Sequence, residues 1–286
     1  MSSEVVDVWS YNLNQEMTNL SQSVELCSFV AINTEYPGII IRPIQSYQNF
    51  NDYRYSVVRN NVNLLKIIEF SLTLFDENGK ELEKAANYKF HFKFDPLKDI
   101  AAEDSIQFLR NNVKIDFEKH RVNGIDPEKF SEKLIPSGLL LNVDITWICY
   151  HGSYDFAFLL KMVLNKELPK TKETFFSYLK TYFNEFYDVK TITSHIEKLS
   201  NVPLLALSDA IKKMAKKQNV VPAESEVERD EQNMSRLTGQ IFFDLKKSLI
   251  SPKMQLELWS SIYGLGPDDA KLYYHRRALS RSIGVL

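Results

Sequence analysis

Apolar residues recur with two different periods along this chain, and the period predicts which elements form. Trp9, Leu13, Met17 and Leu20 lie at helical spacing and predict an opening amphipathic helix. Alternating or continuous apolar runs predict strands over residues 29–34, 39–42, 65–75, 88–94 and 145–150. Further helices are predicted over residues 53–63, 104–112, 127–135 and 154–164, followed by a mainly helical stretch from 172 to about 263.

The order of these elements indicates the fold class. Antiparallel strands come first, with Asp76-Glu77-Asn78-Gly79 as a strong turn between two of them, and strand–helix units follow. This order is typical of an α/β fold with a mixed β-sheet flanked by helices. We expect one domain over residues 1–266 and a basic tail over residues 267–286, where lysine and arginine occur without periodicity.

Composition narrows the class of protein. With 286 residues, of which 44% are hydrophobic, the chain can bury a substantial core. A net charge of −2 argues against a strongly basic nucleic-acid binder, so an RNA contact would need a local patch and bound metal. Cys27 and Cys149 cannot make a disulfide framework, and we expect buried free thiols in a reducing compartment.

Two absences shape the expected location. The first residues are acidic and lack the apolar core of a signal peptide, and no apolar run is long enough for a membrane helix. We therefore expect a protein of the cytoplasm, the nucleus or both, with no membrane partner.

The strongest chemical signal follows the first predicted strand, in the hexapeptide Asn33–Gly38. A strand that ends in acid-x-acid directs two carboxylates to one face, because side chains alternate along a strand. Converging oxygen ligands suit hard divalent cations. Here the first of the two positions is the amide Asn33 and the second is Glu35, so the pattern predicts a metal-nuclease scaffold with part of its site missing.

A wider set of motifs carries a family resemblance. They include Val8-Trp9, Asn33–Gly38, Phe90-His91-Phe92-Lys93-Phe94, Gly124-Ile125-Asp126, His151-Gly152-Ser153-Tyr154-Asp155-Phe156 and Tyr263-Gly264-Leu265-Gly266. In this order, over about 250 residues, the chain resembles the Caf/Pop deadenylase subunits of the Ccr–Not complex, which are poly(A)-specific 3′ exoribonucleases of the DEDD superfamily. The resemblance implies a ribonuclease H-like fold.

The resemblance also implies a site. In the family, four carboxylates hold two Mg²⁺ or Mn²⁺ ions for phosphodiester hydrolysis, and a histidine positions the attacking water. Glu35 and Asp155 match the second and third carboxylates and are the expected metal ligands. Asn33 falls at the first carboxylate, Met234 at the fourth and Arg229 at the histidine.

These replacements predict weak or absent catalysis. An amide lacks the charge that offsets two cations, a thioether has little affinity for Mg²⁺ or Mn²⁺, and a guanidinium cannot act as a base. Asp230 or Glu231 offers a substitute carboxylate if the helix start is irregular. Metal is expected from the family and is weakly bound or absent here.

Some of the matched residues have purely structural interpretations. Glu35 and Asp155 could persist because they satisfy local hydrogen bonds or, for Asp155, because it lies near a helix N-terminus. His151 is interpreted as a buried structural histidine. Asp188 is interpreted as a cap for the helix over residues 190–199.

Partner contacts follow from the same resemblance. Family members dock on the helical-repeat scaffold of the Ccr–Not complex and engage the leucine-rich repeat of a companion deadenylase. The matching docking stretch is Leu134–Leu141, with Leu134, Ile135, Leu139 and Leu141 as candidate contacts. The alternative is that these residues belong to the core.

Three functions remain open from sequence. The first is a degenerate deadenylase that bridges the scaffold subunit and the companion deadenylase as a structural subunit. The second is an active exoribonuclease that removes mRNA poly(A) tails with altered ligands. The third is a non-catalytic RNA-binding module that holds a 3′ end with Lys66, Arg59, the basic tail and nearby aromatic rings.

Overall fold

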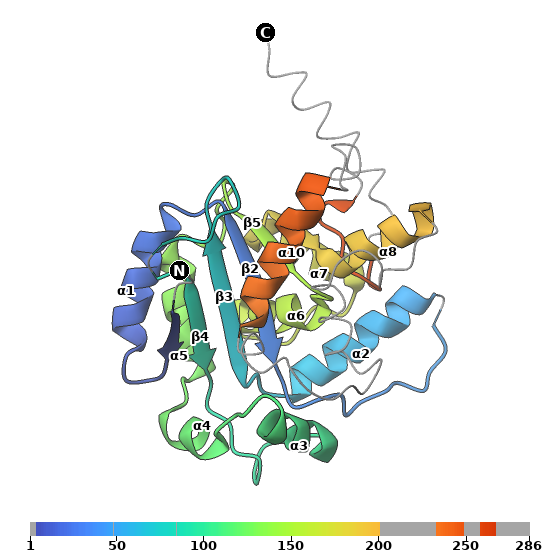
Figure 1. Cartoon of the computed structure of the whole chain (residues 1–286). Helices are drawn as coiled ribbons and strands as arrows, with labels where there is room; N and C mark the ends of the chain where they lie inside the picture. The colour runs from blue at the N-terminus through green and yellow to red at the C-terminus, as the bar shows by residue number, and fades with distance from the viewer. Residues whose placement is uncertain (1–3, 48, 84, 201–232, 249–257, 267–286) are drawn as a thin grey trace.

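The computed structural model describes residues 4–47, 49–83, 85–200, 233–248 and 258–266. Within them, one six-stranded sheet has the strand order β1-β4-β3-β2-β5-β6 (Figure 1). The strands are β1 (Val5–Val8), β2 (Phe29–Glu35), β3 (Glu69–Phe75), β4 (Asn87–His91), β5 (Thr146–Cys149) and β6 (Glu185–Asp188). The strands predicted over residues 29–34 and 145–150 correspond to β2 and β5.

The sheet is mixed. β2 and β4 run antiparallel to β3, whereas β5 runs parallel to β2 and to β6, and β1 runs parallel to β4. β2 therefore lies at the centre, where the antiparallel half meets the parallel half. The expected α/β class with a mixed sheet flanked by helices is confirmed.

Helices cover both faces of this sheet (Figure 1). The described helices are α1 (Leu13–Val24), α2 (Phe50–Leu64), α3 (Glu103–Asn111), α4 (Phe117–Asn123), α5 (Pro127–Leu134), a 3-10 turn η1 (Ile135–Ser137), α6 (Ser153–Leu164), α7 (Lys172–Tyr182), α8 (Val189–Ser200) and α10 (Met234–Ser248). Asp126 caps α5, as predicted, because its side chain accepts a hydrogen bond from the Glu128 amide.

Alternation along β2 divides the core into two layers. Val30 and Ile32 pack in the larger apolar cluster with α1, α5 and α6, whereas Ala31 packs with α10 residues such as Ile241 and Phe242. The period-two pattern of a central strand thus directs successive side chains to opposite layers. As a result, α10 lies directly on β2 and β3.

The prediction of a strand over residues 39–42 is wrong. The segment is an irregular loop, and its backbone groups bond to the Asn61 side chain of α2 instead of to a neighbouring strand. Asn61 Oδ1 accepts from the amides of Ile40 and Ile41 at 2.7 and 2.8 Å, and its Nδ2 donates to the Ile41 carbonyl at 2.7 Å. A single buried amide thus replaces a strand partner.

The start of the first helix and two short elements also differ from the sequence prediction. The opening helix begins at Leu13, not Trp9, because β1 precedes it and the Asn12 Oδ1 accepts from the Trp9 amide at 2.7 Å. β6 interrupts the stretch predicted as helical, and α4 was not predicted. Each of these missed elements is short, so its sequence carries too little periodicity to identify it.

Several earlier expectations lie outside the described residues. Arg229, Asp230, Glu231 and the basic tail over residues 267–286 are among them. Within the described residues, both cysteines are buried and free, as expected, and burial raises the pKa of the Cys27 thiol to about 12. None of the described helices combines the length and the apolar character that crossing a membrane requires.

Candidate functional site

The candidate site begins at the end of β2, where Asn33 and Glu35 point to the same face. Asn33 Nδ2 lies 3.3 Å from Glu35 Oε1, so the amide donates to the carboxylate. The predicted convergence of the two side chains is therefore present. Asn33 thus places an amide donor, in place of a second carboxylate, against Glu35.

Asp155 approaches from the opposite layer. It lies in the first turn of α6, and its Oδ1 accepts from both the amide and the hydroxyl of Thr34, at 2.8 and 2.6 Å. Burial raises the pKa of Asp155 to about 7, with the charges of Asp188 and Glu35 adding to the rise and the Thr34 hydrogen bonds opposing it. Asp155 and Glu35 are therefore close enough for their charges to interact.

These hydrogen bonds bear on the two interpretations of Asp155. The two Thr34 donors tie α6 to the end of β2, which is the structural role considered from sequence. They engage only one of the two carboxylate oxygens. Both a structural role and a ligand role remain compatible with this geometry.

The start of α10 is fixed on the sheet by a polar network around Asn233. Asn233 Oδ1 accepts from the Arg236 amide at 3.0 Å, as an N-cap does, and its Nδ2 donates to Asn87 Oδ1 at 2.8 Å. The hydroxyls of Ser235 and Thr73 lie 2.9 Å apart. These contacts anchor the first turn of α10 to β3 and β4 and so fix the position of Met234.

Met234 itself is the first residue of α10 and packs on apolar surroundings. It lies against the core layer between α10 and the sheet, which includes Ala31 and Ile148, with Phe29 and Tyr150 at its margin. A thioether in such surroundings offers no hard oxygen ligand. Of the matched positions in the described structure, two carry carboxylates, Glu35 and Asp155.

The described residues do not fit a two-metal nuclease site. Across residues 4–47, 49–83, 85–200, 233–248 and 258–266, Glu35 and Asp155 belong to no group of three metal-ligating side chains whose ligand atoms lie within 4.8 Å of one another. The one such group in those ranges is Glu69, His91 and His120. Two hard divalent cations need more converging negative charge than Glu35 and Asp155 supply.

Asp188 organises the backbone beside this site. It is fully buried and accepts from the amides of His151, Lys190 and Tyr263 at 2.8, 2.9 and 2.9 Å. The predicted capping role at the start of α8 is present. The carboxylate also joins the β5–α6 loop to the segment around Tyr263, which the sequence did not indicate.

A group of cationic and aromatic side chains near Asp188 was not singled out from the sequence. The Arg54 guanidinium lies 5.5 Å and the Lys190 ammonium 4.7 Å from the centre of the Tyr263 ring, and His151 meets the same ring edge to face. His151 is half-buried, not buried as predicted. The sequence signal for this cationic and aromatic group was the Tyr263–Gly266 motif. The residues that contact Tyr263 in space lie far from it in the sequence.

The predicted RNA-contacting cations have partners within the chain. Lys66 Nζ lies 2.6 Å from Asp99 Oδ1. Arg59 Nε donates to the Leu168 carbonyl at 3.2 Å, and its Nη2 lies 3.4 Å from Glu167. These pairs reduce the positive charge that Lys66 and Arg59 present to a phosphate.

The predicted docking residues divide into two groups. Leu134 and Leu139 are 1% and 0% exposed and pack in the larger core cluster, so the prediction that they contact a partner directly is corrected. They face inward because α5 and the turn after it pack on α1 and α6. Ile135 and Leu141 are 49% and 57% exposed and remain candidate contacts.

Comparison with known proteins defines the class. The model of the CAF1 family ribonucleases matches residues 8–133 and 139–254. The chain belongs to this family. The poly(A) ribonuclease pop2 of Schizosaccharomyces pombe is 34% identical over 275 residues, which cover 96% of this chain and 78% of the relative.

Solved structures agree with this assignment. The S. pombe Pop2p structure in its Mg²⁺- and Mn²⁺-bound form has a TM-score of 0.77 at 34% identity and covers 91% of this chain and 99% of its own. The yeast CAF1 structure, co-crystallised with the NOT1 MIF4G domain, has a TM-score of 0.72 at 30% identity, with 91% and 96% covered.

A more distant likeness supports the fold name alone. Exonuclease I has a TM-score of 0.50 at 11% identity and covers 79% of this chain and 42% of its own. Together with the mixed sheet and its flanking helices, this likeness establishes the ribonuclease H-like fold expected from the motifs.

Proposed function

We propose that this chain is a subunit of a Ccr–Not-type complex in mRNA poly(A)-tail shortening and turnover. It contributes chiefly as a structural bridge between the scaffold subunit and a companion leucine-rich-repeat deadenylase. Its own 3′→5′ exoribonuclease activity is weak or absent. The protein works where that complex works, in the cytoplasm and the nucleus.

The observation that carries the weak-activity part is the placement of Met234. Asn233 and Ser235 hold the first turn of α10 against β3 and β4, so the helix start carries an apolar thioether packed on the core at the position that the family motif gives to a carboxylate. At the other matched position, the Asn33 amide donates to Glu35. Hard cations bind where negative charge converges, and Asn33 and Met234 contribute none.

The bridging part rests on exposed apolar side chains and on a relative. Ile135 and Leu141 project from the turn after α5, above the core residues Leu134 and Leu139. Exposed apolar side chains beside a rigid core are typical anchors of protein interfaces. The relative co-crystallised with the NOT1 MIF4G domain makes an equivalent scaffold the expected partner here.

A metal-dependent degradation assay tests the proposal. The purified chain and an active family member are compared on a poly(A) oligonucleotide with Mg²⁺ or Mn²⁺, each with and without chelator. We expect little chelator-sensitive degradation by this chain. A pull-down with the scaffold subunit, performed on the same preparation, is expected to retain the chain.

An active nuclease with altered ligands is the first alternative. It is supported by the retained carboxylates Glu35 and Asp155, with Asp230 or Glu231, both outside the described residues, as the substitute ligand. Vigorous chelator-sensitive degradation would favour it. Replacing Asp230 and Glu231 by their amides would then abolish the activity.

A non-catalytic RNA-binding module is the second alternative. Its support is the Tyr263 ring, with the Arg54 and Lys190 cations and His151 around it, because single-strand binders combine positive charge with stacking rings. Poly(A) binding that persists in chelator and falls in a Tyr263→Ala variant would favour this function. Scaffold binding would be unaffected by that substitution.

A further inference from the structure

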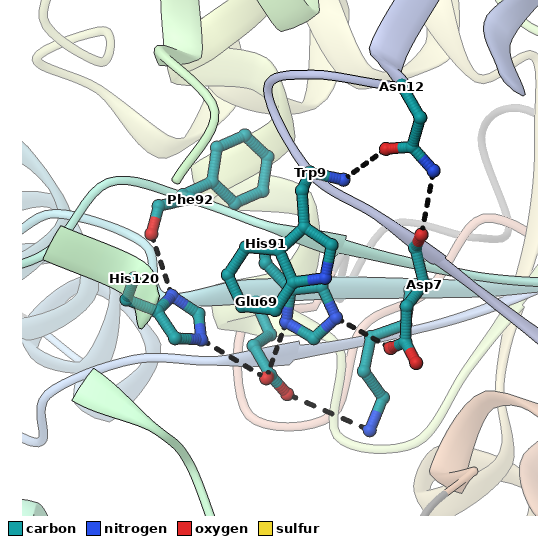
Figure 2. Close-up of polar contacts among 8 residues, drawn as sticks. Asp7, Trp9, Asn12, Glu69, His91, Phe92 and His120 are labelled. Carbon is teal, nitrogen blue, oxygen red and sulfur yellow. Dashed lines mark hydrogen bonds and ion pairs between the residues drawn. The ribbon is translucent and has the colours of Figure 1, made fainter. Parts of the chain in front are cut away.

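A second group of titratable side chains lies on the sheet beyond the candidate nuclease site. Figure 2 shows Glu69 of β3, His91 of β4 and His120 of α4 converging on one spot. They are 5%, 6% and 1% exposed. Glu69 and His91 are direct partners in the β3–β4 register, so their side chains share one face of the sheet.

His120 presents a lone pair to Glu69. Its Nδ1 lies 2.7 Å from the Phe92 carbonyl, and a carbonyl oxygen only accepts, so Nδ1 carries the proton. In a neutral ring, Nε2 is then an acceptor, and it lies 3.4 Å from Glu69 Oε1. Two acceptors that face each other in a buried site require a proton or a metal cation between them.

His91 has the same arrangement. Its Nε2 lies 2.7 Å from Asp7 Oδ1 and its Nδ1 lies 2.9 Å from Glu69 Oε1. When Nε2–H donates to Asp7, the Nδ1 lone pair of the neutral ring also faces Glu69. Carboxylate–histidine–metal and carbonyl–histidine–metal chains orient the ligands of many metal sites in this way.

We propose that Glu69 Oε1, His91 Nδ1 and His120 Nε2 form a binding site for one divalent transition-metal ion of the zinc class. Two imidazole nitrogens and a carboxylate oxygen are a common zinc ligand set, and a water molecule completes four-coordination. The Asp7 carboxylate and the Phe92 carbonyl hold the two rings in the required tautomers.

The distances suit such an ion. Ligands about 2.1 Å from a tetrahedral zinc lie about 3.4 Å from one another. The His120–Glu69 separation of 3.4 Å matches this value, and the His91–Glu69 separation of 2.9 Å needs to widen by a few tenths of an ångström. Side-chain rotation supplies that change without movement of the sheet.

The surroundings hold the group in place. The Trp9 ring stacks on His91 with a centroid distance of 3.9 Å and meets His120 edge to face at 5.2 Å. Asn12 fixes the Trp9 backbone and donates to the Asp7 carbonyl (Figure 2). Lys89 Nζ lies 3.9 Å from Glu69 Oε2, so it faces the carboxylate oxygen that the proposed ion does not use.

The ligand chemistry separates this site from the candidate nuclease site. Imidazole nitrogens favour zinc and similar ions over Mg²⁺, whereas the oxygen atoms of Glu35 and Asp155 have the opposite preference. The proposed ion would join α4 to β3 and β4 and, through Asp7, to β1. Its presence does not depend on whether the chain degrades RNA.

Zinc binding to the purified full-length chain tests the proposal. The chain, without an affinity tag, is stripped with chelator, dialysed and titrated with ZnCl₂ by calorimetry in a large excess of MgCl₂. We expect one zinc ion per chain and an increase in melting temperature. Co²⁺ in its place should give the intense visible absorption of a four-coordinate site with nitrogen ligands.

Substitutions locate the ion. His91→Asn and His120→Asn should each weaken zinc binding by about 100-fold or more, and Asp7→Asn by about 10-fold, since an outer partner contributes less than a ligand. His195→Asn on α8 is the matched histidine control, and Glu35→Gln tests zinc capture at the nuclease site. Both should bind zinc like the parent. Circular dichroism confirms that each variant is folded.

Asp7→Asn keeps the proposal testable if the histidine variants unfold, because the Asp7 side chain is 60% exposed and its loss disturbs no core packing. A folded parent chain that takes up no zinc overturns the proposal, and so does zinc affinity that survives replacement of both His91 and His120. Loss of zinc binding in Glu35→Gln alone would also overturn it.

Discussion

The hydroxyls of Ser235 and Thr73 lie 2.9 Å apart across the interface between α10 and β3. This contact fixes the register of α10 on the sheet. A shift of the helix by one residue would break it and would withdraw Asn233 from Asn87. Tertiary contacts on both sides of Met234 therefore fix its position on the sheet.

Restoring the missing carboxylates is expected to restore catalysis. The double variant Asn33→Asp, Met234→Asp should raise Mg²⁺-dependent degradation of poly(A) by on the order of 100-fold, because ligands of one metal site act as a unit. The rate gains of the two single variants, multiplied together, should fall well short of the gain of the double variant. Initial rates on a labelled poly(A) oligonucleotide, with and without chelator, measure the effect.

The control for this experiment is a double variant at exposed sites on α10 and α4, Gln240→Asp with Val122→Asp. It adds the same charge away from the candidate site and should leave the rate unchanged. Equal, additive gains from the two restoring changes would contradict the idea that Asn33 and Met234 occupy one ligand set.

Ile135 is expected to contact the scaffold subunit. Ile135→Asp places a charge on a side chain that is 49% exposed, so the fold should persist while scaffold affinity falls by about 10-fold or more. Val122→Asp, on α4, is the matched control because Val122 is 61% exposed and apolar. Affinities from calorimetry and a folding check by circular dichroism decide the matter; unchanged affinity in a folded Ile135→Asp variant rejects the docking assignment.

The sequence predicted the features that depend on neighbouring residues and missed those that depend on residues far apart in the sequence. The convergence of Asn33 and Glu35 follows from alternation within one strand, which is a local property. The loop at residues 39–42 has a strand-like composition, but its partner, Asn61, lies in α2. Local pattern cannot identify such a partner.

The same limit applies to the docking stretch and to the buried histidines. Leu134 and Ile135 are adjacent and both apolar. Leu134 nevertheless lies in the core and Ile135 is exposed, because the chain turns sharply at η1. Glu69, His91 and His120 come from separate elements and are joined only by the register of β3 with β4 and by the packing of α4. No spacing in the sequence signals that group.

His151 is expected to make stability depend on pH. Burial, with the nearby charges of Lys190 and Arg54, lowers the pKa of His151 to about 4. The unfolded chain therefore binds a proton near pH 6.5 that the folded chain does not, so stability is fully present above that pH and is lost as pH falls towards 4. The loss amounts to at most about 3 kcal/mol.

Urea denaturation between pH 4 and pH 7.5 measures this effect. His151→Gln should be less sensitive to pH over the interval in which histidine titrates, because glutamine takes up no proton. His195→Gln, on α8, is the matched control and should follow the parent. A parent and a His151→Gln variant with parallel profiles would show that His151 does not contribute.

Gly239 is expected to set how closely α10 approaches the sheet. A Cβ atom built at this residue would lie 2.3 Å from the Phe75 ring and 3.2 Å from the Ala31 Cβ. The Phe75 ring is 1% exposed and packs against Phe243 with a centroid distance of 5.3 Å, so it has little room to move. A larger side chain must therefore push the helix away from β2 and β3.

The Gly239→Ala variant separates this packing effect from helix propensity. Alanine favours a helix over glycine by about 1 kcal/mol, whereas overpacking a core costs about 1–3 kcal/mol, so we expect a net loss of about 1 kcal/mol in the free energy of unfolding. Gln240→Ala, at the adjacent exposed position, supplies the propensity gain without the contact and should be neutral or slightly stabilising. Urea denaturation compares the two variants. If Gly239→Ala were as stable as Gln240→Ala, α10 would not lie in direct contact with β2 and β3, and the position of its first turn on the sheet would lose its main support.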